Sequence, residues 1–392
     1  MGKKINQLPA TPVLLPTDLC IVGSPIDGTM HKVSLKQLRD FIAVLFDPRT
    51  VDIEKLTDLY AFGDEFMLAA NIMPTADAYI SRFITAYNKK LNLFAETGRG
   101  VWKMVSSAYE KLPQVNSNVL TLVMTGLNDI RLAGTNAKTL EKIRQSYRSL
   151  IINQFLKTAI PASDASVTKT GTWKSTYNSS AIGGKAEYLG GKGVSTSTKK
   201  ETLRWTFTGN NVVIGYSGSD GDAMRKQGSF FVSIDGMNKG YYTQNGIWDG
   251  VSDGSYDNTV GPAAILITGL SSGTHTLTIE TQEDEFTVFD YFGTLKYPDQ
   301  CNPLLIGQIP LMTTAGYKAN APYDKATEAA ILQANTVIEE VVRDFTMTGG
   351  YPVAIVPINK AIQLPDDIDK DDVHWNNTGH QHVFNALQAV IR

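Results

Sequence analysis

Cysteine is scarce in this chain, and long hydrophobic runs are missing. The 392 residues include 2 cysteines, Cys20 and Cys301, which lie far apart in the sequence. A disulfide framework is therefore not expected, although one bridge or two buried thiols both fit this count. No run of apolar residues is long enough to cross a bilayer, and residues 1–16 lack the apolar core of a signal peptide. We expect no membrane insertion, and folding in a cytoplasm.

An excess of one charge is missing as well. Lys and Arg number 36 and Asp and Glu 39, which gives a formal net charge of -3. Such a balance offers no basic surface for nucleic acid, so no nucleic-acid partner is expected. Hydrophobic residues make up 42% and charged residues 19%, an ordinary globular composition. The length allows two or three domains.

Strands alternate with helices in two separated parts of the chain, residues 51–162 and 298–392. Strands spaced by helices predict a parallel sheet with crossover helices on its faces. The two parts together predict one α/β domain that is split by an insertion. The expected strands are residues 59–63, 91–94, 118–124, 304–309 and 353–357, and the expected helices are residues 78–87, a segment from residue 101, 140–156 and 325–345.

The intervening residues, 163–297, are rich in Gly, Ser and Thr and show short alternating strands without helices. Turn signals such as Asp235-Gly236 and Ser272-Gly273 separate these strands. The pattern predicts an inserted antiparallel β-sandwich. Its expected strands are residues 203–207, 212–216, 230–234, 264–267, 275–279 and 286–292.

Four short polar blocks follow strands of the predicted parallel sheet or lie near the C-terminus. A parallel sheet places ligands just beyond the carboxyl ends of its strands, so these blocks are the candidate site. They are Gly63-Asp64-Glu65, Ala95-Glu96-Thr97-Gly98, Gly126-Leu127-Asn128-Asp129 and Asp371-Asp372-Val373-His374.

In order and placement, these blocks resemble those of the SGNH (GDSL-type) hydrolases. The resemblance covers the chain outside residues 1–50 and the insertion, and it implies a three-layer α/β/α, flavodoxin-like domain. It also implies that His374 is the general base and that Asp371 orients its ring. The backbone N–H of Gly98 and the side chain of Asn128 would stabilise the oxyanion.

Position 65 departs from that family, which has its nucleophilic serine there. This chain has Glu65, and a carboxylate is a poor nucleophile toward esters. We expect Glu65 to form an ion pair with His374 and to place negative charge in the oxyanion hole. Two interpretations stay open. Glu65 could act as a base that activates water, or the scaffold could be retained for binding after its chemistry was lost.

Three further residues near the C-terminus were weighed for a site. Trp375 could line a substrate cleft or be buried in the core. His380 and His382 are not joined by carboxylates or thiols at metal-ligand spacing, so we expect no metal there. They are expected to pack on the final helix or to cap it.

Part of the insertion resembles jelly-roll, carbohydrate-binding-like modules. The resemblance is carried by residues 230–236 and 270–275. In the loop from Gln244 to Val260, we expect Trp248, Asp249 and Tyr256 to contact sugar, and the acidic loop could hold calcium. A solvated, turn-rich loop without a ligand is the other interpretation. No other cofactor is expected.

The N-terminal segment, residues 1–50, predicts two short strands, at residues 18–22 and 30–33, and then a helix. Residues 5–10, 17–19 and 32–38 resemble the N-terminal adaptors of bacteriophage tail-fibre, tail-spike and head-fibre proteins. The resemblance implies docking on other virion proteins and a homo-oligomer, with a trimer as one form. A plain hairpin and helix is the alternative.

Together these features predict a phage virion protein, assembled in the host cytoplasm, that is a tail or head appendage. It would display a degenerate SGNH-like domain and a jelly roll toward bacterial surface polysaccharide. One alternative is an active carbohydrate esterase that deacetylates such a glycan. Another is a purely structural virion component.

Overall fold

A computed structural model describes residues 19–23, 30–34, 53–68, 75–101, 104, 118–134, 136–176, 193–219, 226–247 and 260–391. The chain divides into two units, Met1–Thr50 and Val51–Arg392. In the first unit, β1 (Leu19–Gly23) pairs antiparallel with β2 (Met30–Ser34), as the sequence predicts. The helix expected after β2 lies outside the described residues.

The second unit contains the expected parallel sheet. Its strand order is β18-β17-β5-β3-β4, and neighbouring strands in this order are parallel. All six residues of the central strand β5 are buried, as a strand covered on both faces requires. The strands are β3 (Asp58–Gly63), β4 (Lys90–Ala95), β5 (Val119–Met124), β17 (Leu304–Gly307) and β18 (Val353–Val356).

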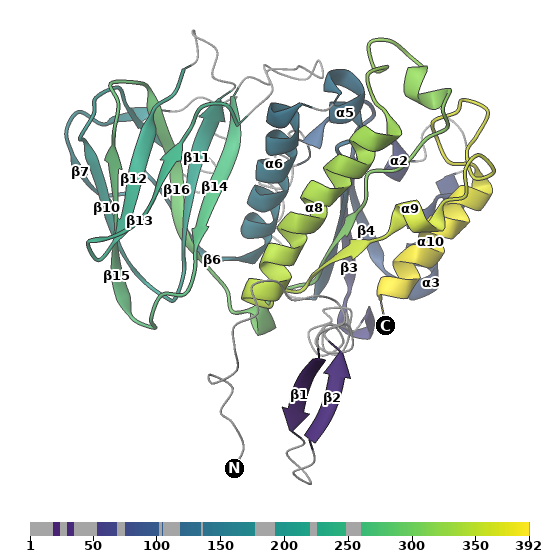
Figure 1. Ribbon diagram of the computed structural model, residues 1–392, viewed down its shortest axis with the longest axis horizontal. Helices are drawn as coiled ribbons and strands as arrows, with labels where there is room; N and C mark the ends of the chain where they lie inside the picture. Colours follow the sequence, from purple (N-terminus) through teal and green to yellow (C-terminus); the bar gives the residue numbers. More distant parts are fainter. Residues whose placement is uncertain are drawn as a thin grey trace. The chain divides into compact units, whose positions relative to one another are not determined.

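Helices cover both faces of this sheet: α6 and α8 lie side by side on one face, and α3 and α10 on the other (Figure 1). The longer helices begin where a side-chain oxygen caps free backbone N–H groups, as Asn136 does for α6 and Thr327 for α8. The helices are α2 (Glu65–Leu68), α3 (Tyr79–Tyr87), α5 (Leu127–Ala133), α6 (Ala137–Phe155), α8 (Glu328–Gly349), α9 (Ile358–Ala361) and α10 (Asn377–Val390). Short 3₁₀ turns are η2 (Ile53–Lys55), η3 (Thr75–Asp77), η5 (Pro298–Gln300) and η6 (Gly316–Lys318).

Two antiparallel sheets form the β-sandwich between the halves of the α/β domain. One has the order β13-β12-β15-β10-β7, and the other has β14-β11-β16-β9-β8, with β6 also pairing β16. Inward-facing side chains of both sheets, such as Trp205 and Phe289, share one core. The strands are β6 (Leu156–Pro161), β7 (Thr168–Thr170), β8 (Lys174–Thr176), β9 (Gly193–Thr196), β10 (Thr202–Thr208), β11 (Val212–Ser219), β12 (Ser229–Ile234), β13 (Met237–Thr243), β14 (Val260–Ile267), β15 (Thr274–Thr281) and β16 (Thr287–Leu295).

The antiparallel pairing begins earlier than residue 163. Helix α6 ends at Phe155, and the chain continues at once into β6, whose Leu156 pairs with Leu295 of β16. Where the chain leaves the sandwich, the backbone N–H of Lys296 donates to the carbonyl of Phe155 at 2.8 Å. The entry and exit of the insertion are therefore hydrogen-bonded to each other.

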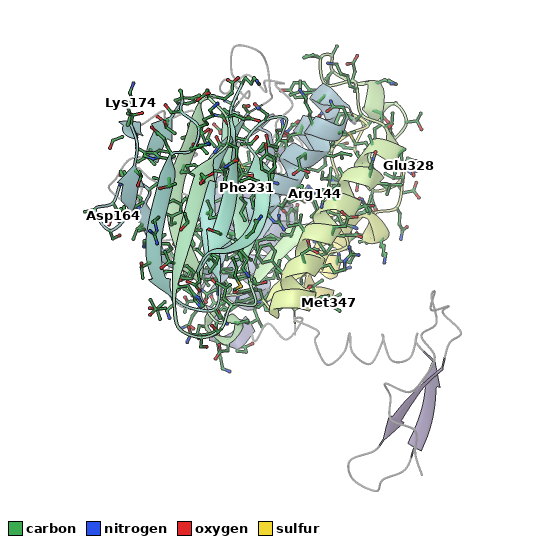
Figure 2. The ribbon with its side chains drawn as sticks, turned by 60° about the vertical axis from the view of Figure 1, so that its left-hand side comes forward. Arg144, Asp164, Lys174, Phe231, Glu328 and Met347 are labelled. Atoms are coloured by element: carbon green, nitrogen blue, oxygen red, sulfur yellow. The ribbon has the colours of Figure 1, made fainter. Side chains whose placement is uncertain are left out.

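Two surface contacts of this unit involve Arg144 and Phe231, which are labelled in Figure 2. Arg144 of α6 forms an ion pair with Glu340 of α8 at 2.9 Å, which joins the two helices on one face of the sheet. On the outer face of the sandwich, Phe231 lies beside Tyr241 of the neighbouring strand, and both are exposed. Among the described residues, no helix combines the length and apolar character needed to span a membrane.

Candidate active site

Three loops at the carboxyl edge of the parallel sheet carry the first residues of the candidate site. Glu65 begins α2 directly after β3, Gly98 lies in the turn after β4, and Asn128 lies in the first turn of α5. Because neighbouring parallel strands end at one edge, the three residues converge. Gly98 has a φ of +73°, a left-handed backbone that glycine adopts without strain.

The carboxylate of Glu65 is bound by the two donors that the family resemblance assigns to the oxyanion hole. Its Oε2 accepts from the backbone N–H of Gly98 at 2.8 Å and from Nδ2 of Asn128 at 3.1 Å. We call these two groups the donor pair. Glu65 is only 5% exposed, so these charge-assisted bonds replace much of its hydration. A tetrahedral oxyanion would need the same donors.

Asp371 and His374 form a hydrogen-bonded pair on the loop before α10. Oδ2 of Asp371 lies 2.6 Å from Nδ1 of His374, and Oδ1 accepts from the backbone N–H of His374 at 2.9 Å. Burial acts to raise the pKa of Asp371, but these hydrogen bonds outweigh it, and the pKa falls below its usual value. The ionised carboxylate therefore orients the ring and places the proton on Nδ1.

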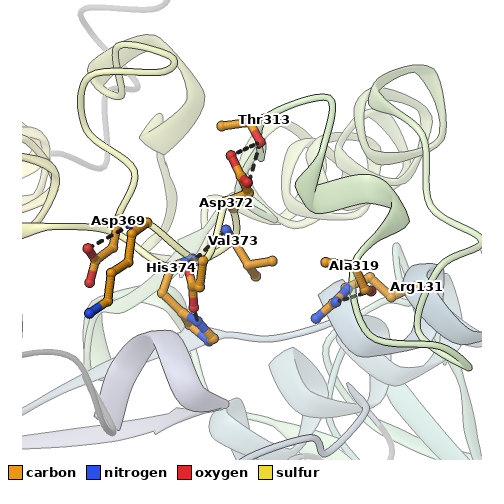
Figure 3. Close-up of polar contacts among 9 residues, drawn as sticks. Arg131, Thr313, Ala319, Asp369, Asp372, Val373 and His374 are labelled. Carbon is orange, nitrogen blue, oxygen red and sulfur yellow. Dashed lines mark hydrogen bonds and ion pairs between the residues drawn. The ribbon is translucent and has the colours of Figure 1, made fainter.

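The loop that carries this pair is tied to the segment after β17. Oγ1 of Thr313 donates to Oδ1 of Asp372 at 2.8 Å, and the backbone N–H of Thr313 donates to the Asp372 carbonyl at 3.3 Å (Figure 3). Asp372 itself has a φ of +64°. The contact holds the backbone of the histidine loop in a conformation that a free aspartate rarely adopts.

The expected ion pair between Glu65 and His374 is not formed, so that expectation is wrong. Within the described part of the chain, Nε2 of His374 is buried and has no hydrogen-bond partner. The ring instead packs on Phe66, with centroids 5.1 Å apart. The physical reason is that Glu65 is already satisfied by the donor pair, which offers two hydrogen bonds in place of one ion pair.

Trp375 is part of the core beneath the site. It is 1% exposed and packs edge-on against Phe66 and Tyr79. An indole this deeply buried has no face for a ligand, so of the two alternatives for Trp375 the core position is confirmed and the ligand contact is wrong.

Two further buried acidic residues, Asp64 and Asp129, lie in the blocks that carry Glu65 and Asn128. Asp64 is 1% exposed, and burial, together with the charge of Glu65, raises its pKa well above the usual value. Asp129 forms a buried ion pair with Lys142 of α6 at 2.7 Å. Its Oδ2 also accepts from the backbone N–H of Val101 at 2.7 Å, which fixes the segment that follows Gly98.

Arg131 and Tyr323 are site residues that the sequence analysis missed. Nε of Arg131 donates to the carbonyl of Tyr323 at 3.1 Å. Its Nη2 donates to the carbonyl of Ala319, also at 3.1 Å (Figure 3). The hydroxyl of Tyr323 reaches the carbonyl of Gly98 at 3.4 Å. Burial lowers the pKa of Arg131, while the nearby charge of Glu65 acts to raise it. No family block marks either residue, although Arg131 follows the third block within the same helix.

Other predicted residues fall elsewhere. Trp248, Asp249 and Tyr256 lie outside the described residues, as do most of the proposed calcium loop and most of the helix expected from residue 101. His380 is buried within α10, and burial lowers its pKa to about 4. His382 bonds Asp367 at 2.7 Å. Among the described residues, no group of three potential metal ligands comes together.

No protein-family model matches the chain, and no curated protein matches it. Among solved structures it is similar to a member of the lipolytic protein G-D-S-L family from Veillonella parvula DSM 2008, at 8% identity over 85% of this chain and 97% of that one, with a TM-score of 0.36. It is also similar to a family two carbohydrate esterase from Cellvibrio japonicus, at 12% identity over 40% of this chain, with a TM-score of 0.25; the match spans 36% of that esterase. A third similar structure is the CBM36-1 domain of a xylanase from the hindgut metagenome of Trinervitermes trinervoides, at 17% identity over 35% of this chain and 94% of that domain, with a TM-score of 0.23.

Proposed function

We propose that this chain is a bacteriophage virion component that binds bacterial surface polysaccharide without hydrolysing it. The binding parts are an esterase-like α/β domain and an inserted sandwich of the jelly-roll type. One observation carries the non-hydrolytic part of the proposal. The Glu65 carboxylate occupies the donor pair that acyl transfer would require.

Acyl transfer by a serine-type mechanism needs a hydroxyl nucleophile, a base within reach of it and a free oxyanion hole. At position 65 the hydroxyl is replaced by a carboxylate. The base, Nε2 of His374, has no hydrogen-bond partner. The hole holds negative charge, which repels an incoming oxyanion. The nucleophile and the oxyanion hole therefore both fail, and the base has no hydroxyl to activate.

The rival hypothesis of a water-activating Glu65 meets a specific obstacle. A base that activates water must act while the acyl carbonyl oxygen sits in the oxyanion hole. Oε2 of Glu65 is bound to both members of the donor pair. The same side chain cannot fill the hole and leave it open for substrate, so binding is favoured over turnover.

The remaining parts of the proposal rest on sequence resemblance and on surface chemistry. The N-terminal segment resembles phage adaptors, which motivates docking on virion proteins and a homo-oligomer, with a trimer as one form. The sandwich carries an exposed aromatic pair, Phe231 and Tyr241, and aromatic side chains suit sugar rings. Trp248, Asp249 and Tyr256 stay proposed sugar contacts, and calcium stays proposed for their loop.

Hydrolysis of p-nitrophenyl acetate by the full chain tests the non-hydrolytic part. We expect a rate equal to that of His374→Ala, because no group of the site completes a catalytic cycle. A wild-type rate clearly above this matched control would overturn the proposal in favour of an active esterase.

A glycan array probed with the same full chain tests the binding part. Binding to bacterial surface polysaccharide is expected, whereas no signal on any glycan would favour the purely structural alternative.

Light scattering, which measures the mass of the oligomer, is to be compared between the full chain and a fragment of residues 51–392 to test the role of the N-terminal segment. We expect the oligomer to require residues 1–50, and an unchanged mass after their removal would contradict this role.

A further inference from the structure

The carboxylate of Glu65 is placed as a bound ligand would be. Its Oε2 sits at 2.8 Å and 3.1 Å from the donor pair, while Nδ2 of Asn128 also donates to the carbonyl of Arg99 at 3.2 Å. The second bond fixes the amide so that one N–H points at the carboxylate. The donors are therefore organised independently of Glu65, by the backbone of the Gly98 turn and by Arg99.

Charge around the donor pair also favours an anion. Arg131 is 5% exposed and lies near enough to Glu65 for their charges to interact. Burial, and then the charge of Glu65, raise the pKa of Asp64, the nearest acidic neighbour along the chain, which disfavours a second negative charge beside Glu65. The adjacent acid Asp129 is neutralised by Lys142. An anion at the donor pair thus meets the charge of Arg131, which interacts most strongly with Glu65 and less strongly with the carboxylate of Asp371.

We infer that the donor pair is a binding site for a small carboxylate anion, with Glu65 as its built-in occupant. Truncation of Glu65 beyond Cβ removes one methylene and the carboxylate, a volume between those of formate and acetate. A free formate or acetate ion should enter the vacated space and accept the same two hydrogen bonds. The native side chain then acts as a tethered inhibitor, because it denies the donors to any external carboxylate or ester carbonyl.

Thermal melting of Glu65→Ala and of the roomier Glu65→Gly in sodium formate or acetate tests this inference. We expect a saturable rise in Tm over sodium chloride of equal ionic strength, since a ligand that binds only the folded state stabilises it. Wild type and Glu65→Gln, which keep a side chain at the donor pair, should show no such rise. Asn128→Ala in the truncated background should weaken it.

If a truncated variant is unfolded on its own, formate should restore its folded fraction where chloride does not. Equal Tm shifts in wild type, or no specific effect in either truncated variant, would overturn the inference. It rests on the proposed function only in placing Glu65 at the donor pair in solution. Ester hydrolysis by the wild-type protein would contradict the proposed function. If the wild-type protein does not hydrolyse esters and the truncated variants do not bind formate, only the present inference is contradicted.

Discussion

Residue 65 controls both the nucleophile and the oxyanion site. The change Glu65→Ser would release the donor pair and supply an O–H group that can donate to the unpaired Nε2 of His374. Because Asp371 already orients the ring, we expect Glu65→Ser to hydrolyse p-nitrophenyl acetate faster than wild type. Burst and steady-state kinetics would measure the gain.

Two second-site changes make that gain specific. His374→Ala in the Glu65→Ser background should return the rate to that of wild type, because the hydroxyl loses its base. Asn128→Ala in the same background should lower kcat by about 10²- to 10³-fold, the usual cost of losing one oxyanion donor. If the Glu65→Ser rate is unchanged by either His374→Ala or Asn128→Ala, the hydrolysis occurs at another site.

The sequence predicted which residues form the site but not which partners they hydrogen-bond. Position in the four blocks was enough to place Glu65, Gly98 and Asn128 at one edge of the sheet. It could not say that Glu65 turns to the donor pair instead of His374, because side-chain direction depends on which acceptor or donor is nearest in space. For Trp375 the sequence left a cleft and the core open, because a position next to His374 does not fix how deeply a side chain is buried; the structure buries it against Phe66 and Tyr79.

At the scale of elements, His275 joins two turns of the sandwich. Its Nδ1 lies 2.6 Å from Oδ2 of Asp235, in the turn between β12 and β13, and its Nε2 lies 2.8 Å from the carbonyl of Ser271. With acceptors at both nitrogens, the charged ring is favoured. The bond to Asp235 and then the bond to Ser271 raise the pKa of His275 above 6.5.

This arrangement predicts a pH-dependent contribution to stability. A raised folded-state pKa means that the stabilisation by His275 is complete below its unfolded pKa of about 6.5 and is lost as pH rises through the folded value. We expect the Tm difference between wild type and His275→Gln to be largest near about pH 5 and to shrink above about pH 7. Asp235→Asn should show the same trend. A difference that stays constant across this range would contradict the role of the charged ring.

Some elements were readable from sequence and others were not, for identifiable reasons. Strand β5 was predicted because VLTLVM is an apolar run, interrupted only by Thr121, between turn residues, and the structure buries all of it. Strand β6 was missed because it follows α6 with no Gly or Pro to mark the change. Strand β13 was missed because MNKGYYT, at the edge of its sheet, is largely exposed and has no apolar face that alternates regularly.

At the scale of the second unit, the sandwich and the α/β domain share buried surface. Val213 and Ala264 of the sandwich belong to the same hydrophobic cluster as Ile151 of α6. The chain crosses between the two layers through β6 and back after β16, and the two crossings are hydrogen-bonded. The insertion is therefore anchored by a strand that the sequence assigned to the host domain.

Two excised fragments distinguish whether the inserted sandwich begins at residue 156 or at residue 163. A fragment of residues 163–297 lacks β6 and leaves β16, whose nine residues are all buried, with an open edge from Tyr291 to Leu295. A fragment of residues 156–297 keeps that pairing. Both fragments expose the surface that packs on α6, so they differ only in β6 and the residue Ala162 that follows it.

We expect the longer fragment to be monomeric by gel filtration and to melt cooperatively, and the shorter one to aggregate. An unpaired, apolar strand edge is a template for association between chains, and the shorter fragment has one that the longer fragment covers. Equal solubility and equal Tm would mean that β6 is dispensable to the sandwich, and the insertion would then begin after Ala162. The comparison thus decides whether the helix-to-strand junction at Phe155 and Leu156 is where one folding unit ends and the next begins.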